Sequence, residues 1–117
     1  MNIQELGRIG EDSVAYYIEK IGCQILERNY RTYSGEIDII FIESDCLVFG
    51  EVKTRRSDSF GLPCESVNQR KREKIITVAK HFVISKNLFD VNIRFDVFEV
   101  YFKERKIRHI RNAYYAT

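Results

Sequence analysis

Three ionisable residues, Asp38, Glu51 and Lys53, fall within one apolar, strand-like segment. The runs 36–43 and 46–54 are rich in Ile, Val, Phe and Leu, as strands prefer, and a short polar turn joins them. A hairpin centred on that turn sets Asp38 directly against Glu51, with Cβ atoms roughly 4.5–5.5 Å apart. Two carboxylates that close repel each other unless a cation lies between them, and Mg²⁺ prefers carboxylate oxygen. The pattern Asp-x12-Glu-x-Lys therefore predicts a phosphodiesterase site that uses Mg²⁺ or Mn²⁺.

Lys53 follows Glu51 by two residues, so both side chains point to the same face of the strand. Lys53 could supply positive charge there or activate a water, which makes Asp38, Glu51 and Lys53 the candidate catalytic residues. The same register also sets Glu36 against Lys53, so a simple cross-strand ion pair is a structural alternative. Glu51 could equally be a solvated residue on a one-sided sheet. Spacing alone leaves both interpretations open.

The composition indicates one globular domain over residues 1–117. The chain is 44% hydrophobic and 31% charged, and it has one Pro and six Gly, which argues against linkers and disorder. The N-terminal sequence MNIQELGRIGED lacks the apolar run of a signal peptide, and no stretch approaches a membrane span. We therefore expect a cytoplasmic protein with no membrane partner.

Three cysteines, Cys23, Cys46 and Cys64, are far apart, and the two histidines are His81 and His109. No CxxC or Cys/His ligand spacing is present, which disfavours zinc. A cysteine nucleophile stays open, but nothing local supports it, so we expect these thiols to have no chemical role.

Charge is distributed unevenly along the chain, although the net charge is only +2. Residues 1–52 carry four Lys/Arg against ten Asp/Glu, residues 53–74 carry seven against three, and residues 75–117 carry eight against four. The positive excess begins directly after Glu51, which suits a site that holds phosphates beside a metal. A mild basic excess is also common on ordinary surfaces.

Residues 3–21 form a predicted amphipathic helix, because their apolar residues recur at helical spacing and Gly22 is a plausible stop. Glu11 falls at the edge of the apolar stripe, where it either reaches solvent or faces the sheet. Gly7 and Gly10 beside it would allow close backbone approach.

A second helix is predicted over residues 65–86, with Ser66 as a candidate cap. Its core stripe begins at Ile75, and Lys71 and Arg72 continue that stripe one turn backwards. Charge runs are usually solvated, but this placement puts both cations on the sheet-facing side and favours phosphate contact.

The remaining segments complete an α/β fold. Strands are predicted over 23–33, 92–102 and 106–115, and a loop over 55–66 carries Arg55 and Arg56 away from the central strand. In the strand after the second helix, Arg94 and Asp96 share a face and could pair. The order is helix, three strands, helix, one or two strands, with helices able to cover both sides of a mixed sheet.

This order, together with the motifs GEIDII, FGEVKTR and RFDVFEV, resembles the YraN-like family of predicted bacterial endonucleases. More broadly it resembles the restriction-endonuclease-like superfamily defined by the PD-(D/E)XK motif, which includes the archaeal-type Holliday junction resolvases. The resemblance covers nearly the whole chain, from GRIGED to HIRNAYY. It implies a restriction-endonuclease-like three-layer sandwich.

The resemblance also implies roles for individual residues. Asp38 and Glu51 would ligate Mg²⁺ or Mn²⁺, the backbone carbonyl of Val52 would be a further ligand, and Glu11 would complete the metal site. Lys53 would position or activate the attacking water.

Two positions depart from the family pattern. Gly50 stands where the family usually has a β-branched residue, which predicts a bend or bulge in the strand. Lys71 matches a basic position of the second helix, but Arg72 follows it where relatives often carry Gln, which leaves the helix's exact role open.

We therefore expect a divalent-metal-dependent endonuclease that hydrolyses DNA phosphodiester bonds, with structured or damaged DNA as candidate substrates. The residues expected to contact the nucleic acid are Arg55, Arg56, Lys71 and Arg72. Double-strand cleavage would favour a homodimer, since one such site cuts one strand. The alternatives are a nucleic-acid-binding module with this fold and little activity, and a DNA-processing adaptor that uses Tyr114 and Tyr115 as exposed contacts.

Overall fold

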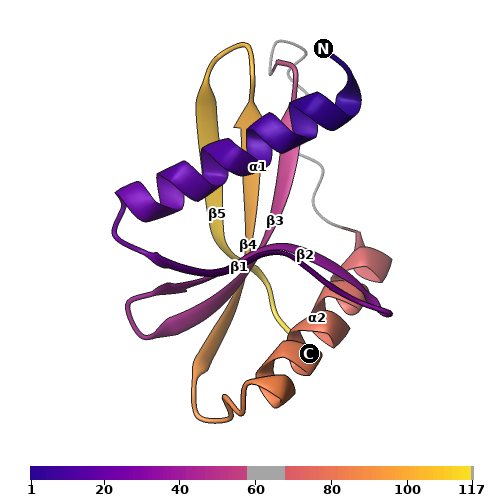
Figure 1. Cartoon of the computed structure of the whole chain (residues 1–117), viewed down its shortest axis with the longest axis vertical. Coiled ribbons are helices and arrows are strands. Elements are labelled where there is room, and N and C mark those ends of the chain that lie inside the picture. Colours follow the sequence, from indigo (N-terminus) through magenta and orange to yellow (C-terminus); the bar gives the residue numbers. More distant parts are fainter. Residues whose placement is uncertain (58–67, 117) are drawn as a thin grey trace.

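The computed structural model describes residues 1–57 and 68–116, and its element order is the predicted one with two final strands (Figure 1). The five strands form one sheet in the order β1-β2-β3-β4-β5, in which β3 and β4 run parallel and the other neighbours antiparallel. Neither helix of the described ranges is long and apolar enough to cross a membrane. The elements are α1 (Ile3–Lys20), β1 (Gln24–Thr32), β2 (Gly35–Glu43), β3 (Cys46–Arg55), α2 (Gln69–Ser85), β4 (Asn92–Tyr101) and β5 (Lys106–Tyr114).

Helix α1 begins after Asn2, whose side chain accepts a hydrogen bond from the N–H of Glu5 at 2.8 Å. Most of the predicted stripe is buried, although Tyr17 is only partly buried and Ile21 is 42% exposed. One of the buried residues, Gly10, lies directly against β3. A Cβ atom at Gly10 would overlap the hydroxyl of Thr54, whereas a Cβ at Gly7 would meet open space. Close backbone approach is therefore confirmed for Gly10 and not for Gly7.

Helix α2 begins at Gln69, later than predicted, and Asn68 caps it by accepting the N–H of Lys71 at 2.9 Å. The predicted cap at Ser66 is wrong because an asparagine, which caps as well as serine does, stands immediately before the first helical residue. Ser66 itself and most of the predicted loop lie outside the described residues. The predicted core stripe of the helix is confirmed by Ile75, Val78, Ala79 and Phe82, all buried.

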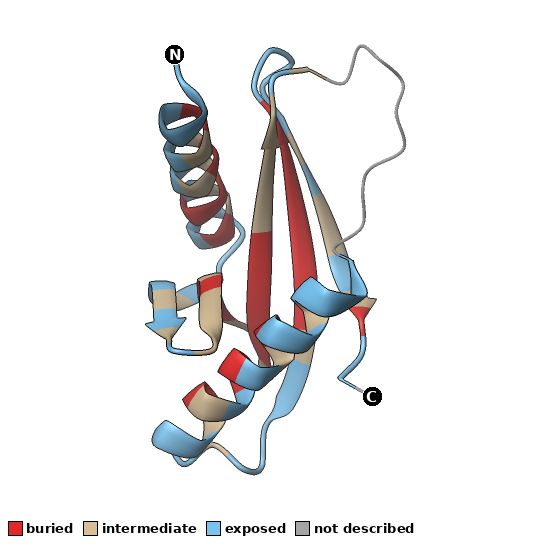
Figure 2. Ribbon diagram, turned by 90° about the vertical axis from the view of Figure 1, so that its right-hand side faces the viewer, coloured by how far each residue is buried: buried red, intermediate tan, exposed pale blue. Residues whose placement is uncertain are grey.

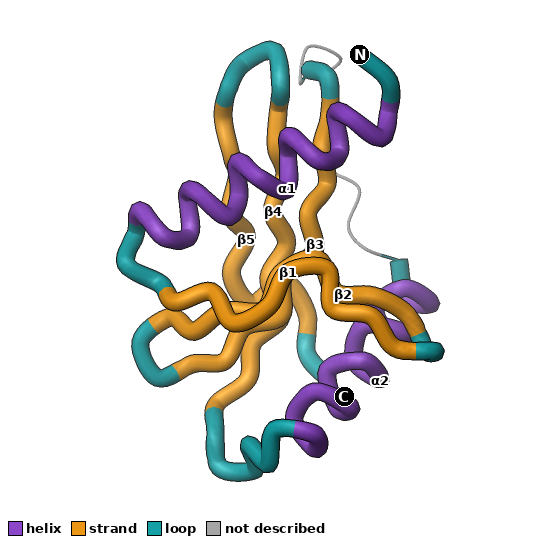
Figure 3. The backbone as a smooth tube through the Cα atoms, viewed as in Figure 1, coloured by secondary structure: helices purple, strands orange, loops and turns teal. Residues whose placement is uncertain are grey.

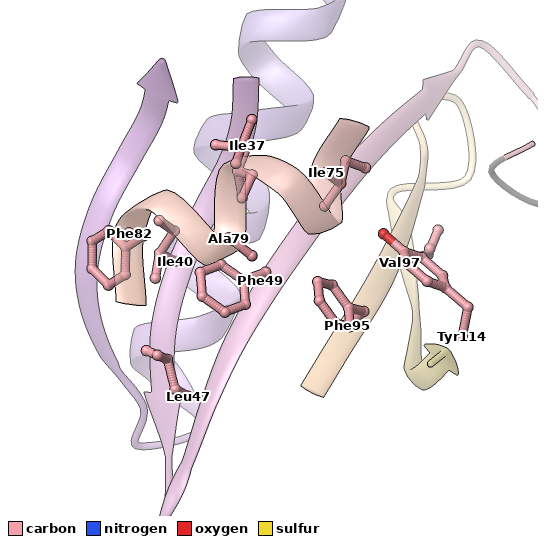
Figure 4. Packing of buried hydrophobic residues seen from close by; sticks show 11 residues of the cluster. Ile37, Ile40, Leu47, Phe49, Ile75, Ala79, Phe82, Phe95, Val97 and Tyr114 are labelled. Atoms are coloured by element: carbon pink, nitrogen blue, oxygen red, sulfur yellow. The ribbon is translucent and has the colours of Figure 1, made fainter. Parts of the chain in front are cut away.

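Buried apolar residues form two clusters on opposite faces of the sheet, because alternate strand positions point to opposite sides (Figure 2). Helix α2 covers one face (Figure 4) and α1 covers the other. This arrangement is compatible with the predicted three-layer sandwich. The sheet residues involved include Ile40, Phe49 and Phe95 under α2, and Phe41, Val48 and Phe98 under α1.

The two C-terminal tyrosines differ in exposure. Tyr115 is 69% exposed, as predicted, but Tyr114 is only 6% exposed. Tyr114 pairs with Phe95 in the β4–β5 ladder and its ring stacks on that phenylalanine, with centroids 5.2 Å apart. The prediction that Tyr114 is exposed is therefore wrong, because the final strand continues to this residue under α2.

The β2–β3 hairpin has the predicted register, with Ile40 opposite Phe49, but its ladder ends at Ile39 and Gly50. Beyond this point β2 stays paired with β1 and turns away, while β3 continues along β4 (Figures 1 and 3). The predicted ladder pairs of Asp38 with Glu51 and of Glu36 with Lys53 are therefore not formed.

Gly50 does not mark a bulge. The β3–β4 ladder runs through this residue, opposite Asp96, without a register shift, and the β2–β3 ladder ends here with the pair Ile39–Gly50. A Cβ atom here would approach side-chain atoms of Ile39 and Phe98 to 2.8 and 2.9 Å. The predicted bulge is therefore wrong, and close packing beneath α1 explains the glycine.

Candidate active site

Asp38 lies where β2 leaves β3. Its Oδ2 accepts a hydrogen bond from the N–H of Val52 at 2.8 Å, so a side chain replaces the missing ladder partner. In an extended strand the N–H and C=O of one residue point to the same edge, so the carbonyl of Val52 faces the same gap. Burial, together with the nearby Glu51 carboxylate, raises the pKa of Asp38 to about 8. Glu11 and Glu36 add to this effect.

Glu51 is buried on β3, with 8% of its side chain exposed, and its Oε1 accepts a hydrogen bond from Lys71 Nζ at 2.6 Å. Lys71 comes from the first turn of α2, which confirms its predicted position on the sheet-facing side. Burial of Lys71 opposes its charge, but the hydrogen bond and the attraction to Glu51 are stronger and raise its pKa. One carboxylate of the pair is thus neutralised by a lysine.

Glu11 faces this acidic region from α1 and is partly buried. In the amide orientation that satisfies its neighbours, the side-chain nitrogen of Asn29 donates to Glu11 Oε1 at 3.2 Å and to Glu36 Oε1 at 3.1 Å. Burial raises the pKa of Glu11, the Asn29 hydrogen bond lowers it, and Glu36 raises it further, with a net increase. The role of Asn29 was not predicted; its left-handed backbone, with φ 51°, is a conformation that asparagine tolerates well.

Glu36 does not neutralise Lys53. Its Oε2 accepts a hydrogen bond from Arg31 Nε at 3.0 Å, across the β1–β2 hairpin. The structural alternative of a Glu36–Lys53 pair is therefore wrong. Lys53 is partly buried and lies opposite Glu99 in the parallel β3–β4 ladder.

The acidic residues do not form a complete cage for an ion. Among residues 1–57 and 68–116, no three Asp, Glu, His or Cys side chains are close enough to hold a metal ion by themselves. Asp38 and Glu51 nevertheless converge beside the carbonyl of Val52. Mg²⁺ normally keeps several waters and binds through one or two carboxylates, so this donor set fits a partly hydrated Mg²⁺ or Mn²⁺.

The predicted nucleic-acid contacts divide between the two faces of the sheet. Arg55 lies two residues beyond Lys53 on the same strand, so it shares the face of Glu51. The Arg72 guanidinium lies 5.0 Å from the centre of the Tyr114 ring, also on the α2 side. Arg56 instead donates to the carbonyl of Met1 at 3.2 Å, before α1. Arg56 is therefore separated from the other predicted contacts.

A second polar cluster lies on the α1 face, around the fully buried Asp96. Its carboxylate accepts two hydrogen bonds from Arg94, as predicted, at 2.8 Å each, one from His109 Nε2 at 2.7 Å and one from the Asn112 N–H at 3.0 Å. His109 Nδ1 lies 3.0 Å from the Tyr17 hydroxyl. Burial opposes the charge of Asp96, but these bonds lower its pKa. Sequence reasoning missed His109, because its partners are distant along the chain.

The described cysteines are poor candidates for nucleophiles. Cys23 is buried and Cys46 is partly buried, both as free thiols. Burial raises the pKa of each thiol, whereas reactive cysteines have a lowered pKa. Cys64 lies outside the described residues.

These features define a small mixed α/β protein with a largely buried carboxylate pair at the point where β2 and β3 separate. The family model described as "Uncharacterised protein family UPF0102" matches residues 10–100, and the chain belongs to this family. The YraN-like family predicted from the motifs is thereby confirmed.

Relatives match along nearly their whole length. A UPF0102 protein of Clostridioides difficile (strain 630) is 50% identical over 114 residues, which cover 97% of this chain and 100% of the relative. A UPF0102 protein of Alkaliphilus metalliredigens (strain QYMF) is 47% identical over 112 residues, covering 95% and 98%. One from Clostridium acetobutylicum is 44% identical over 115 residues, covering 95% and 94%.

Proposed function

We propose that this protein is a divalent-metal-dependent endonuclease that hydrolyses phosphodiester bonds in DNA and has a restriction-endonuclease-like fold. The observation that carries the proposal is the pair of the partly buried Asp38 and the buried Glu51, whose repulsion contributes to an Asp38 pKa of about 8. Strongly perturbed carboxyl groups of this kind occur preferentially at functional sites. A mixed sheet covered by one helix on each face is compatible with the fold.

The cation would be held by the carboxylates of Asp38 and Glu51 and by the carbonyl of Val52, with Glu11 as the additional acidic group. A bound Mg²⁺ or Mn²⁺ would polarise the scissile phosphate and lower the pKa of the attacking water.

The lysines of the site would supply positive charge for the substrate phosphate and the attacking water. Lys71 neutralises Glu51 in the structure. A cation at Glu51 would release the Lys71 ammonium, which could then contact the substrate phosphate. Lys53 would hold the attacking water and stabilise the developing negative charge. Arg55 and Arg72 would attract the nucleic-acid backbone, so binding should weaken steeply with salt.

Calorimetry with Mg²⁺ and Mn²⁺ tests the site directly, on the wild type and on Asp38→Asn and Glu51→Gln. The same proteins are tested for cleavage of single-stranded, duplex, nicked and four-way-junction DNA. We expect the wild type to bind metal and cut at least one substrate, and both variants to lose both properties. Asp90→Asn, at an exposed acid, is the control. A wild type that binds neither ion, even with DNA present, would overturn the proposal.

One observation favours a second function, a nucleic-acid-binding module with little activity. Because Lys71 already neutralises Glu51, that carboxylate does not require a cation in the folded protein. DNA binding that is unchanged in Asp38→Asn, with no cleavage by the wild type, would select this alternative. The adaptor function is weakened, since Tyr114 is buried. Sedimentation on duplex DNA tests for the homodimer that double-strand cleavage favours.

A further inference from the structure

The β4–β5 hairpin carries a second group of cations. Residues 103–108, KERKIR, contain four Lys/Arg and one Glu, and five of these six residues are exposed. Arg105 in the turn has a left-handed backbone, with φ 52°. The cations of this hairpin group are Lys103, Arg105, Lys106 and Arg108.

Strand register places Arg108 on the face of the candidate active site. Arg108 lies opposite Glu99 in the β4–β5 ladder, and Glu99 lies opposite Lys53 in the β3–β4 ladder. Directly opposed residues point to the same face of a sheet. Arg108 and Lys53 therefore lie on one face, two strand spacings or about 10 Å apart.

Glu99 occupies the middle of this row and is buried, with 1% exposed. Its Oε1 lies 3.5 Å from Arg108 Nη1, while its Oε2 has no hydrogen-bond partner among the described residues. A buried carboxylate is costly without nearby positive charge. Glu99 thus pairs with Arg108 on one neighbouring strand and lies opposite Lys53 on the other.

Lys53, Glu99 and Arg108 form a first row across the three strands, and a second row lies two residues nearer the hairpin turn. Lys106 lies opposite Tyr101, and Tyr101 lies opposite Arg55. The Lys106 ammonium is 5.2 Å from the centre of the Tyr101 ring, a cation–π distance. This row begins about 13 Å beyond Glu51, measured as four extended residues of β3.

The hairpin turn is attached to the end of β3, so its position relative to the candidate site is fixed. The N–H of Phe102 donates to the carbonyl of Arg55 at 2.9 Å, and the N–H of Lys103 donates to the carbonyl of Arg56 at 2.8 Å. Figure 1 shows the turn beside the end of β3 and away from α2. The basic rows therefore lead from the carboxylate pair towards the hairpin.

We propose that the β4–β5 hairpin is a second binding surface for the phosphodiester backbone of DNA. A strand bound at the candidate site would continue across the rows of Lys53 and Arg55 and reach Lys106, Arg108 and the turn. The inference rests on the proposed function for the choice of DNA as the polyanion. The inference is supported by charge complementarity with DNA, because the hairpin segment 103–108 has four cations and one acid. It continues a face that already bears Lys53, Arg55, Lys71 and Arg72.

The test is duplex DNA binding by fluorescence anisotropy across a KCl series, in EDTA so that no metal-dependent cleavage occurs. The hairpin variant is Lys103→Gln/Arg105→Gln/Lys106→Gln, which leaves the Arg108–Glu99 pair intact. The control is Arg8→Gln/Lys80→Gln/Lys86→Gln, an equal loss of charge at exposed residues of α1 and at α2 or its cap.

We expect the hairpin variant to bind at least about tenfold more weakly at low salt. Its slope of log K against log[salt] should be shallower by about 2–3, since each lost phosphate contact contributes about 0.9. The control should stay within about twofold of the wild type. Urea unfolding of all three proteins tests whether the variants fold. A hairpin variant that matches the folded control in affinity and slope overturns the inference.

Failure of this inference is distinguishable from failure of the proposed function. Hairpin-dependent DNA binding without cleavage in Mg²⁺ or Mn²⁺ supports the hairpin surface and counts against the nuclease. DNA cleavage by a protein whose DNA binding does not depend on the hairpin supports the nuclease and counts against the hairpin surface. A wild type that binds polyglutamate more tightly than DNA overturns the inference and assigns the hairpin to an acidic protein partner.

Discussion

Two aspartates of the same sheet, the fully buried Asp96 and the partly buried Asp38, have very different surroundings. Asp96 accepts four hydrogen bonds, from Arg94, His109 and a backbone N–H, and its pKa is lowered. Among the described residues, Asp38 accepts one, from the N–H of Val52, and burial together with the neighbouring Glu51 raises its pKa to about 8.

The difference separates a structural carboxylate from a candidate functional one. This fold can neutralise a buried acid, as it does at Asp96 with an arginine and a histidine. At Asp38 it supplies another carboxylate instead. Buried polar groups are normally satisfied within a protein, so this exception is the reason why we propose a cation at Asp38. The following variants test that distinction, from the largest expected effect to the smallest.

Asp96→Asn should lower the free energy of unfolding by about 1.5–3 kcal/mol, because His109 and the partly buried Arg94 lose the anion they share, although Glu43 still accepts a hydrogen bond from Arg94 at 2.6 Å. Urea denaturation measures the change. Asp90→Asn, at an exposed acid, should stay within about 0.5 kcal/mol of the wild type. A loss below about 1 kcal/mol for Asp96→Asn would contradict the structural role.

Asp38→Asn should raise the free energy of unfolding, whereas Asp96→Asn lowers it. In EDTA at pH 9, where the wild-type carboxyl group is ionised, removing the repulsion with Glu51 should raise the free energy of unfolding by about 1–3 kcal/mol, since one pKa unit corresponds to about 1.4 kcal/mol. Added Mg²⁺ should stabilise the wild type and not the variant. A variant as destabilised as Asp96→Asn would remove the contrast between the two sites.

The raised pKa also predicts a pH dependence. Between the usual pKa of 3.8 and the folded-state value of about 8, the folded protein holds a proton on Asp38 that the unfolded chain has lost. The contribution of Asp38 to stability should therefore fall as pH rises from about 4 to about 8, by at most about 1.4 kcal/mol per unit, and stay level above that. Urea titrations of the wild type and Asp38→Asn in EDTA, from pH 5 to 9, measure the difference. A difference independent of pH would show that Asp38 is ionised throughout.

Tyr17→Phe should have the smallest effect, a loss of about 1 kcal/mol, because His109 is left without its hydroxyl partner. Tyr16→Phe, at a 67% exposed ring, is the matched control. Because the Tyr17 hydroxyl contacts His109 and none of the proposed metal ligands, the proposed cleavage activity should be unchanged. Loss of cleavage at full stability would show that the two faces are functionally coupled.

Local patterns were sufficient to predict much of this arrangement. Helical periodicity predicted α1 and α2 and correctly placed Lys71 on the sheet-facing side of α2. Strand alternation predicted the hairpin register as far as Ile39 and Gly50. These features depend on residues that are close in the sequence. They needed no knowledge of the tertiary fold.

The errors arose where distant segments decide the outcome. The ladder ends beside Asp38 because β2 follows β1 away from β3, which the hairpin alone does not indicate. The burial of Tyr114 depends on α2, and the environment of His109 depends on α1. Asn29 reaches Glu11 only because α1 packs near β1.

The parallel pairing of β3 with β4 has a consequence for the order of folding. Glu11, Asp38 and Glu51 all lie in residues 1–52, which carry ten acids and four cations, whereas Lys71 and the whole of β4 come later. A nascent chain that has made only β1–β3 therefore brings carboxylates together without their lysine. Non-local pairings of this kind form slowly. We expect the N-terminal half to remain uncompacted during synthesis until α2 emerges and supplies the missing charge.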